Sequence, residues 1–341
     1  MTNKDVDALH GKLAALNRVG LAHLPTPLQC LERLSAHLDG PTIWIKRDDL
    51  TGLGMGGNKL RKLDYVLREA IDAGCDTIVS GGVVQSNSQR QVAAASAKLG
   101  LACHLAVYHG RVPPPSPEYE SSGNAFLNRI FGATLHDVPW TGDRNAAIEQ
   151  LCEQLANGGK KAFIVPYGVS NGLGAAGYAS AALEISTQYR EVDIVPSAIV
   201  HCTGSGGTQA GLAIGVAACL PHTKVVGIDI DAEPARVKAD VIKHASAAAA
   251  LLDIDFTETS IEVVAGLSGP GYGIPHAKTI SAIHLMGRLE GLIVDPVYSG
   301  KGLAGLISLI QAGRWSRDEH VVFVHTGGEP AVFAYRTTIN L

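Results

Sequence analysis

The fold of this chain is decided by the stretch Lys46-Arg47-Asp48-Asp49-Leu50-Thr51-Gly52-Leu53-Gly54-Met55-Gly56-Gly57-Asn58-Lys59. A short buried strand, Ile43–Ile45, is predicted just before it. Four glycines then fall within six residues. After them Asn58 opens a helical pattern, in which apolar residues recur from Leu60 to Leu67 at i, i+3 and i+4 spacing. We therefore expect Lys59 in the first turn of a helix, behind a loop with little side-chain bulk.

A lysine at that place has an unusual electrostatic environment. The N-terminus of a helix carries partial positive charge, which disfavours an ammonium group. The amine of Lys59 is thereby biased toward the neutral, nucleophilic form that imine chemistry requires. An ordinary solvated surface lysine is the alternative, and the stretch taken alone favours that alternative.

Length, composition and charge limit the class of protein. The 341 residues, 46% hydrophobic and 18% charged, suffice for two lobes with substantial cores. A net charge of -4 without a basic tail argues against a nucleic-acid or anionic-membrane partner. No apolar run approaches the ~20 residues of a spanning helix, and the N-terminus lacks the apolar core of a signal peptide. The six cysteines form no CxxC pair, so we expect no metal site and no disulfide framework, and we predict a cytoplasmic protein.

Along the chain, apolar strands alternate with amphipathic helices. Strands are expected at 43–45, 77–79, 102–107, 134–138, 162–165, 198–201, 224–228 and 321–324. Helices are expected at 3–19, from 58 onward, and at 88–99, 121–131, 144–156, 173–189, 208–219, 233–251, 277–290 and 302–312. This rhythm predicts an α/β fold with mainly parallel sheets covered by helices on both faces.

A second candidate site is the run Gln85-Ser86-Asn87-Ser88, between the strand that we expect to end near Ser80 and the helix that we expect to begin near Ser88. Small polar residues at such a joint present backbone N–H groups and hydroxyls to an anion. The alternative is simple capping of the helix by Ser86 or Asn87, which is common.

The third candidate site is the glycine-rich run Thr203-Gly204-Ser205-Gly206-Gly207-Thr208, between a predicted strand and a predicted helix. Glycines let the backbone curl around a phosphate, and hydroxyls add donors at the positive end of the helix. A dinucleotide-binding loop requires G-x-G-x-x-G, and Gln209 occupies the position of the last glycine.

Two loops bounded by glycine and proline each carry a tyrosine, Tyr272 in 269–275 and Tyr298 in 295–301. A lone tyrosine in a loop is most often a packing residue with a solvated hydroxyl.

Together these runs resemble the fold-type II pyridoxal-phosphate (PLP) enzymes. The likeness extends from Leu24-Pro25-Thr26-Pro27-Leu28 to Thr326-Gly327-Gly328. It is greatest for the branch that holds D-cysteine desulfhydrase, L-cysteate sulfo-lyase and 1-aminocyclopropane-1-carboxylate (ACC) deaminase. The resemblance implies a two-lobed architecture like that of tryptophan synthase β, with a smaller domain, 55–165, inserted into a large PLP-binding domain, 1–54 plus 166–341. It also implies that Lys59 forms the Schiff base with PLP.

The other roles implied by the resemblance are carried over position by position. The catalytic residues would be Lys59, Ser86, Tyr272 and Tyr298. The cofactor contacts would be Lys59, Asn87, Gly204, Ser205, Gly206, Gly207, Thr208, Tyr298 and Thr326. The substrate contacts would be Gln85, Ser86, Asn87 and Ser88. The chain departs from the family at Ser88, where relatives often have His or Gln.

One position discriminates between activities within this branch. ACC deaminase has Glu after the second tyrosine, as a partner for the pyridine nitrogen, whereas this chain has Ser299. Thr326 is at the place where fold-type II enzymes set a Ser or Thr beside that nitrogen. A neutral hydroxyl cannot hold the nitrogen protonated as a carboxylate can, so the cofactor is a weaker electron sink. That suits the expulsion of a good β leaving group better than the opening of a cyclopropane.

The resemblance therefore implies a PLP-dependent β-elimination lyase that acts on a β-substituted amino acid. D-cysteine, giving pyruvate, sulfide and ammonia, is the first substrate, and L-cysteate, giving sulfite instead of sulfide, is close behind. ACC deaminase is one alternative. A non-catalytic α/β protein that holds a phosphorylated ligand is another. The family implies a homodimer.

Overall fold

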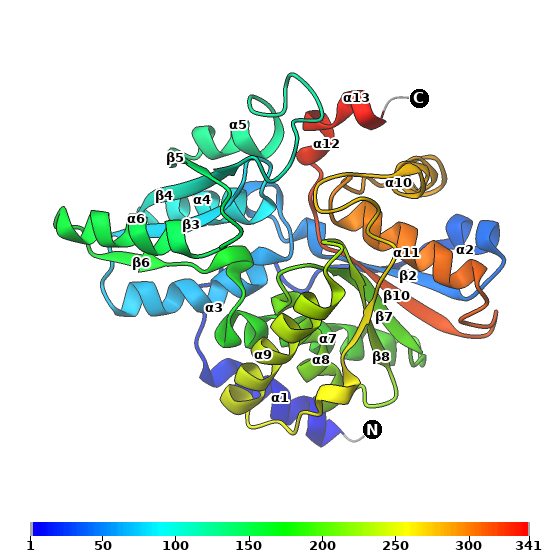
Figure 1. Cartoon of the computed structure of the whole chain (residues 1–341). Helices are drawn as coiled ribbons and strands as arrows, with labels where there is room; N and C mark the ends of the chain where they lie inside the picture. Colours follow the sequence, from blue (N-terminus) through cyan, green and yellow to red (C-terminus); the bar gives the residue numbers. More distant parts are fainter. Residues whose placement is uncertain (1–2, 340–341) are drawn as a thin grey trace.

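Two β-sheets form the framework of the protein in the computed structural model, which describes residues 3–339 (Figure 1). The six-stranded sheet has the order β1-β2-β10-β7-β8-β9, and the four-stranded sheet the order β5-β4-β3-β6. Among the ten strands found in these residues, only β1 and β2 pair antiparallel. The strands are β1 (Leu28–Cys30), β2 (Thr42–Arg47), β3 (Thr77–Val83), β4 (Ala102–His109), β5 (Thr134–Pro139), β6 (Ala162–Ile164), β7 (Ala198–Thr203), β8 (Lys224–Asp229), β9 (Glu262–Val264) and β10 (His320–His325).

Helices cover both faces of each sheet. They are α1 (Asn3–Ala15), α2 (Glu32–Leu38), α3 (Lys59–Asp72), α4 (Asn87–Leu99), α5 (Gly123–Ile130), α6 (Ala146–Asn157), α7 (Gly172–Arg190), α8 (Gly207–Cys219), α9 (Pro234–Leu252), α10 (Ala277–Glu290), α11 (Ser299–Gln311), α12 (Ala331–Ala334) and α13 (Arg336–Ile339). None of those between residues 3 and 339 combines the length and apolar character needed to cross a bilayer.

The central strand β10 shows why a strand of the six-stranded sheet is a continuous apolar run in the sequence. Val321 and Phe323 pack in one core cluster with residues of α2, α10 and α11. Val322 and Val324 pack in a second cluster with residues of α7, α8 and α9. Successive side chains of a strand point to opposite faces, so both faces of this sheet are buried. Figure 1 shows the two groups of helices on either side of these strands.

The four-stranded sheet is built in the same way. Ile78 of β3 belongs to the cluster that includes Val92 of α4. Its neighbour Val79 packs with Ile148 and Leu151 of α6 on the other face. All four strands of this sheet lie between residues 77 and 164, and the strands of the other sheet lie outside 55–165. The domain boundaries at 54/55 and 165/166 stay a prediction.

The predicted α/β class with mainly parallel sheets is confirmed, and several element ends differ. Strand β3 does not end near Ser80, because its pairing with β4 continues as far as Val83 opposite Tyr108. Helix α1 ends four residues early, at Ala15, and the backbone turns at Asn17, whose φ is +54°. Helix α11 begins at Ser299 rather than at 302. The short strands β1 and β9 and the short helix α2 were not expected from the sequence.

Candidate active site

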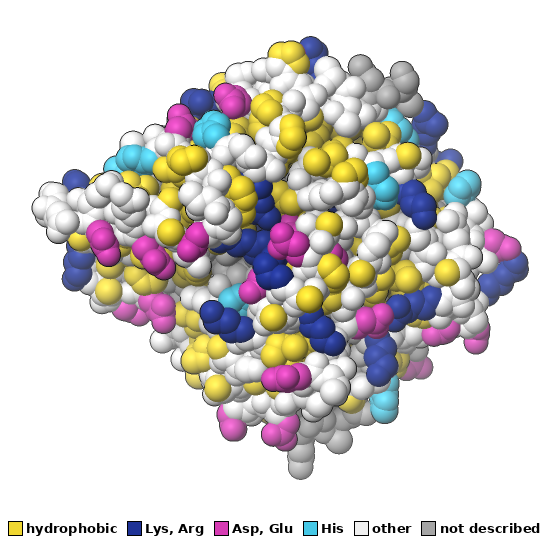
Figure 2. All heavy atoms as spheres, in the orientation of Figure 1, with side chains coloured by type: hydrophobic (Ala, Val, Ile, Leu, Met, Phe, Trp, Pro, Cys, Tyr) yellow, Lys and Arg dark blue, Asp and Glu magenta, His cyan; other side chains and the backbone are white. Residues whose placement is uncertain are grey.

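A pocket lies at the carboxyl ends of β3, β7 and β10, where ligands bind in open α/β sheets. Its lining brings together eleven of the residues predicted from the sequence, namely Lys59, Ser86, Asn87, Ser88, Gly204, Ser205, Gly206, Thr208, Tyr272, Tyr298 and Thr326. Lys and Arg side chains gather near the middle of the face shown in Figure 2, with acidic side chains beside them.

Lys59 is the first residue of α3, as predicted, and its surroundings fix its position. The backbone N–H of Asn58 donates to the carbonyl of Thr326 (3.1 Å), and its side-chain amide donates to Thr208 Oγ1 (2.9 Å). Lys59 Nζ donates in turn to Asn58 Oδ1 (3.0 Å). Burial is the main cause that lowers the pKa of the Lys59 amine to about 8; the charges of Cys202 and Asp295 oppose this effect, and the charge of Arg90 adds to it. More of the Lys59 amine is therefore neutral at neutral pH than in an ordinary lysine.

Arg90 also shapes the loop before Lys59. Its guanidinium, which is fully buried, donates to the carbonyls of Gly54 and Gly56 (the latter at 2.9 Å) and to Asn124 Oδ1 (2.7 Å). Carbonyls that would otherwise point into the protein unpaired are thereby satisfied.

The glycine-rich loop has the shape of a phosphate cup. Gly206 has a φ of +81°, and a Cβ there would lie 2.8 Å from the backbone nitrogen of Val241, so only glycine fits without displacement. The N-terminus of α8 follows directly. Thr203 Oγ1 is buried in the pocket lining without a hydrogen-bond partner. A phosphate would supply the missing partner and would face the positive end of α8, so these residues fit the phosphate of PLP.

A buried lysine lies behind this cup. Lys62 is one turn after Lys59, and its Nζ donates to the Gly168 carbonyl (2.9 Å) and to Ser170 Oγ (3.2 Å). Burial lowers the pKa of Lys62 well below the ordinary value, and the charge of Lys59 adds to this effect. A Cβ on Gly207 would come within 2.9 Å of Lys62 Nζ, so Gly207 forms the back of the loop and is not itself part of the lining.

The turn before α4 combines the two interpretations that the sequence left open. Ser86 Oγ caps the helix by accepting from the Gln89 N–H (3.2 Å), yet it also lines the pocket. Its own hydrogen has no partner among residues 3–339. Asn87 Oδ1 accepts from Asn124 (2.7 Å), which orients the Asn87 amide. Ser88 Oγ is buried in the lining without a partner.

Gln85 was predicted as a substrate contact, but it is not part of the pocket lining. Its amide donates to the carbonyl of Ser122 (2.9 Å) and accepts from the Asn124 N–H (2.9 Å). The Gln85 side chain therefore points away from the pocket and anchors the segment before α5.

Thr326 and Ser299 differ in position. Thr326 lines the pocket, and its hydroxyl lies 3.3 Å from the thiol of Cys202. Ser299 is buried outside the lining, where Oγ accepts from the Asp295 N–H (2.8 Å) and lies 2.6 Å from Asp295 Oδ1 and 3.2 Å from the Gly327 carbonyl. The Asp295 carboxylate also accepts from the N–H groups of Tyr298 (3.0 Å) and Ser299 (2.7 Å). Ser299 and Asp295 thus fix the start of α11, which carries Tyr298 into the pocket.

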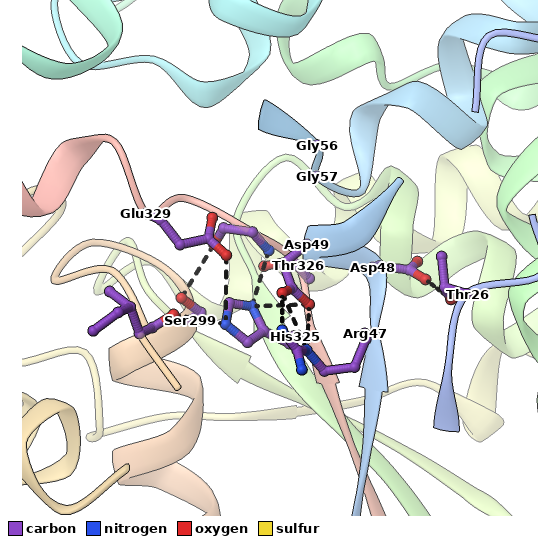
Figure 3. A network of polar contacts seen from close by, with 12 residues as sticks. Thr26, Arg47, Asp48, Asp49, Gly56, Gly57, Ser299, His325, Thr326 and Glu329 are labelled. Atoms are coloured by element: carbon purple, nitrogen blue, oxygen red, sulfur yellow. Dashed lines mark hydrogen bonds and ion pairs between the residues drawn. The ribbon is translucent and has the colours of Figure 1, made fainter. Parts of the chain in front are cut away.

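His325 holds the turn that presents Thr326 (Figure 3). Its Nδ1 accepts from the Gly327 N–H (3.2 Å), so the proton is on Nε2, which donates to the Ile293 carbonyl (2.8 Å). The ring lies between Asp49 (4.0 Å) and Glu329 (3.7 Å).

Asp49, His325 and Glu329 offer ligand atoms within 4.8 Å of one another, a spacing that could hold a metal ion. However, both oxygens of Asp49 accept from Arg47, and both ring nitrogens of His325 are hydrogen-bonded. The Asp49 and His325 ligand atoms therefore already take part in hydrogen bonds, which position the chain around Thr326.

Sequence reasoning missed a charged wall of the pocket. Asp231, two residues after β8, forms ion pairs with Arg144 (2.6 Å) and Arg111 (3.5 Å). The Arg111 guanidinium lies 4.1 Å from the centre of the Tyr272 ring and donates to Tyr167 Oη (2.8 Å). Arg144, Tyr167 and Asp231 line the pocket.

The two predicted tyrosines meet at this wall. Their hydroxyls lie 2.5 Å apart, with the rings edge to face. Burial raises the pKa of both Tyr272 and Tyr298 well above the ordinary value, so both hydroxyls keep their protons at neutral pH.

Comparison with known proteins places the chain in a family. Residues 19–327 match the family model described as pyridoxal-phosphate dependent enzyme. The D-cysteine desulfhydrases of Salmonella newport (strain SL254) and Salmonella enteritidis PT4 (strain P125109) are 39% identical over 323 residues, which cover 95% of this chain and 97% of each relative.

Solved structures agree with this assignment. A crystal structure described as that of an ACC deaminase homologue matches with a TM-score of 0.88 and 33% identity, over 97% of this chain and 98% of that chain. Threonine deaminase isoform 2 from Solanum lycopersicum, with a TM-score of 0.68 and 17% identity over 100% of this chain and 94% of its own, shares the fold. The resemblance predicted from the sequence is thereby confirmed, and the chain belongs to the family of pyridoxal-phosphate dependent enzymes.

Proposed function

We propose that this protein is a carbon–sulfur lyase that eliminates the β substituent of D-cysteine and releases pyruvate, sulfide and ammonia. The observation that carries the proposal is the convergence of Lys59, the glycine loop and Thr326 on one pocket. The pocket belongs to a chain 39% identical to D-cysteine desulfhydrase. The lowered pKa of Lys59, a buried lysine in the pocket lining, favours a catalytic protein over a ligand-binding protein without chemistry.

The residues of the pocket divide the work of elimination. PLP, when bound, withdraws electrons from Cα of the amino acid. Lys59 holds the cofactor and, as a neutral amine, accepts the proton from Cα. Ser86 and Ser88 have hydroxyl hydrogens free to bind the substrate carboxylate. The C–S bond then breaks, and its electron pair leaves with sulfur while a double bond forms between Cα and Cβ. Water replaces nitrogen at Cα, giving pyruvate and ammonia.

L-cysteate is the second candidate substrate, and the charged wall favours it. Arg144 lines the pocket, and Arg111 lies directly behind Tyr272. The guanidinium groups of Arg111, Arg144 and Arg236 all pair with the buried carboxylate of Asp231, and two of them also pair with Asp240. Such a wall would attract a sulfonate on Cβ, which carries a full negative charge before the bond breaks. ACC deamination is less well supported, because the position of the deaminase glutamate is Ser299, which lies outside the lining.

A pyruvate-release assay with D-cysteine, L-cysteate, ACC and D-serine tests this proposal. We expect pyruvate from D-cysteine and little 2-oxobutanoate from ACC. If the charged wall determines the substrate, we expect pyruvate from L-cysteate instead. Lys59→Ala should lower turnover by at least ~10²–10⁴-fold, the usual loss when a general base is removed. Efficient ACC deamination would overturn the substrate, and a Lys59→Ala variant within about tenfold of the wild type would overturn the role of the lysine.

We also propose that the enzyme is a cytoplasmic homodimer. The six cysteines are all free, which suits a reducing compartment. Exposed apolar side chains on α5 and α12, namely Phe126, Ile130 and Phe333, suggest a surface that a second copy covers. Light scattering on the wild type and on Phe333→Asp tests this, since a monomeric wild type would contradict it.

A further inference from the structure

Cys202 and Thr326 meet at the floor of the pocket. Cys202 is on β7, and Thr326 directly follows β10, the neighbouring parallel strand. Cys202 Sγ lies 3.3 Å from Thr326 Oγ1, which is within hydrogen-bond range for sulfur. Both residues are buried, and both line the pocket. A thiol therefore contacts the one hydroxyl that the family assigns to the pyridine nitrogen of PLP.

The thiol at this place keeps its proton. Burial is the main cause that raises the pKa of Cys202 to about 11; the charge of Asp295 adds to this effect, and the contact with Thr326 and the charge of Lys59 oppose it. At neutral pH the sulfur therefore has an S–H to donate, and among the described residues Thr326 Oγ1 is its side-chain partner.

A threonine hydroxyl has one hydrogen and can accept from other donors. When the S–H donates to Oγ1, the hydroxyl hydrogen of Thr326 is free to point into the pocket, toward an acceptor. When Oγ1–H donates to sulfur instead, only a lone pair faces the pocket. The direction of this bond therefore decides whether Thr326 meets an unprotonated or a protonated ring nitrogen.

We propose that Cys202 is a positioning residue: its S–H donates to Thr326 and turns the Thr326 hydroxyl hydrogen toward an unprotonated pyridine nitrogen of PLP. The proposal rests on the placement of PLP given above and deepens it. An unprotonated ring nitrogen makes PLP a weaker electron sink. This setting suits substrates whose Cβ substituent leaves readily, as the proposed carbon–sulfur lyase requires.

The ring nitrogen can be observed directly by NMR of protein loaded with PLP that is labelled with ¹⁵N in the ring. We expect the wild type to show the resonance of an unprotonated ring nitrogen. Cys202→Ala should move this resonance toward that of the protonated form, and Cys202→Ser, which retains a donor, should restore it. Cys219→Ala is the matched control, because Cys219 is an equally buried thiol that contacts the Gly215 carbonyl in α8 (2.9 Å) and does not line the pocket.

A double-mutant cycle with Thr326→Val distinguishes an effect of Cys202 through Thr326 from a general loss of packing. If Cys202 acts through Thr326, Cys202→Ala should not move the resonance further once the hydroxyl is gone. An unchanged resonance in Cys202→Ala, equal shifts in the Ala and Ser variants, or an undiminished effect in the Thr326→Val background would each overturn the proposal. The measurement needs bound PLP but no turnover. If the enzyme fails to act on D-cysteine, the proposed function is contradicted, but the resonance of the ring nitrogen still tests the role of Cys202.

Discussion

Replacing His325 by Asn or by Gln separates its two hydrogen bonds. An Asn side chain places an oxygen near the position of Nδ1 and keeps the acceptor for the Gly327 N–H. A Gln side chain places an amide N–H near the position of Nε2 and keeps the donor to Ile293. Both variants remove the ring, and with it any charge between Asp49 and Glu329. The pair therefore tests one contact against the other at constant charge.

The magnitudes follow from these contacts. In His325→Gln the N–H of the buried residue Gly327 loses its acceptor, which costs about 1–3 kcal/mol of stability. In His325→Asn the Ile293 carbonyl loses its donor, but Ile293 is 49% exposed, so water can replace the ring. His325→Gln should thus unfold at a lower denaturant concentration than His325→Asn. Only Gln releases the Gly327 N–H, next to Thr326. If the PLP-bound protein is destabilised by about 1.4 kcal/mol more than the cofactor-free protein, the Kd for PLP rises roughly tenfold in His325→Gln. In His325→Asn the Kd stays close to that of the wild type.

The assays are denaturant unfolding of the cofactor-free protein and titration of PLP by its visible absorbance. His320→Gln is the control, because His320 is on the same strand and accepts from the Trp44 indole (3.2 Å), away from the pocket. Equal PLP affinities for the Asn and Gln variants would refute the reasoning, since His325 would then stabilise the fold without directing the turn.

Three further predictions concern the pocket itself. Attachment of PLP to the cofactor-free protein should accelerate with pH around a midpoint near 8, because burial disfavours the charged form of Lys59; a midpoint near the ordinary 10.5 would contradict this. Gly206→Ala should lose PLP on dialysis, whereas Gly110→Ala, which also has positive φ (+89°) but open space around it, should retain it. Ser86→Ala should lose about 1 kcal/mol of stability with the helix cap and raise KM roughly ten- to a hundredfold, and an unchanged KM would remove Ser86 from the substrate site.

The parts of the site that could be predicted from the sequence are those whose residues lie in short contiguous stretches. Lys59 and the glycine loop each follow a strand and open a helix, so local pattern alone places them at the carboxyl edge of a sheet. Gln85 shows the limit of that reasoning. It adjoins Ser86 in the sequence, but β3 runs on to Val83, and the tight turn that follows sends the Gln85 side chain toward Asn124 instead.

The charged wall could not be predicted, because its members come from separate segments. Arg111 is in a proline-rich loop and Arg144 in an irregular segment before α6, and neither has a periodic signal. Their partner Asp231 lies two residues after β8, a strand of the other sheet, so their contact depends on how the two sheets are placed. Asp295 did carry a signal, since an acidic residue shortly before a helix is a common cap, and it could have been found on that ground.

The position of β10 has a consequence for how the protein is made. This strand follows all the other strands of the two sheets in the sequence, yet it lies inside the six-stranded sheet, between β2 and β7. Until it emerges from the ribosome, β2 and β7 each present an open edge that can pair with another chain. The four-stranded sheet, by contrast, is encoded without interruption by the other sheet's strands. Since Thr326 follows β10, the candidate site is complete only once translation has passed both sheets, and we expect a chain that stops before His320 to aggregate and to lack the site.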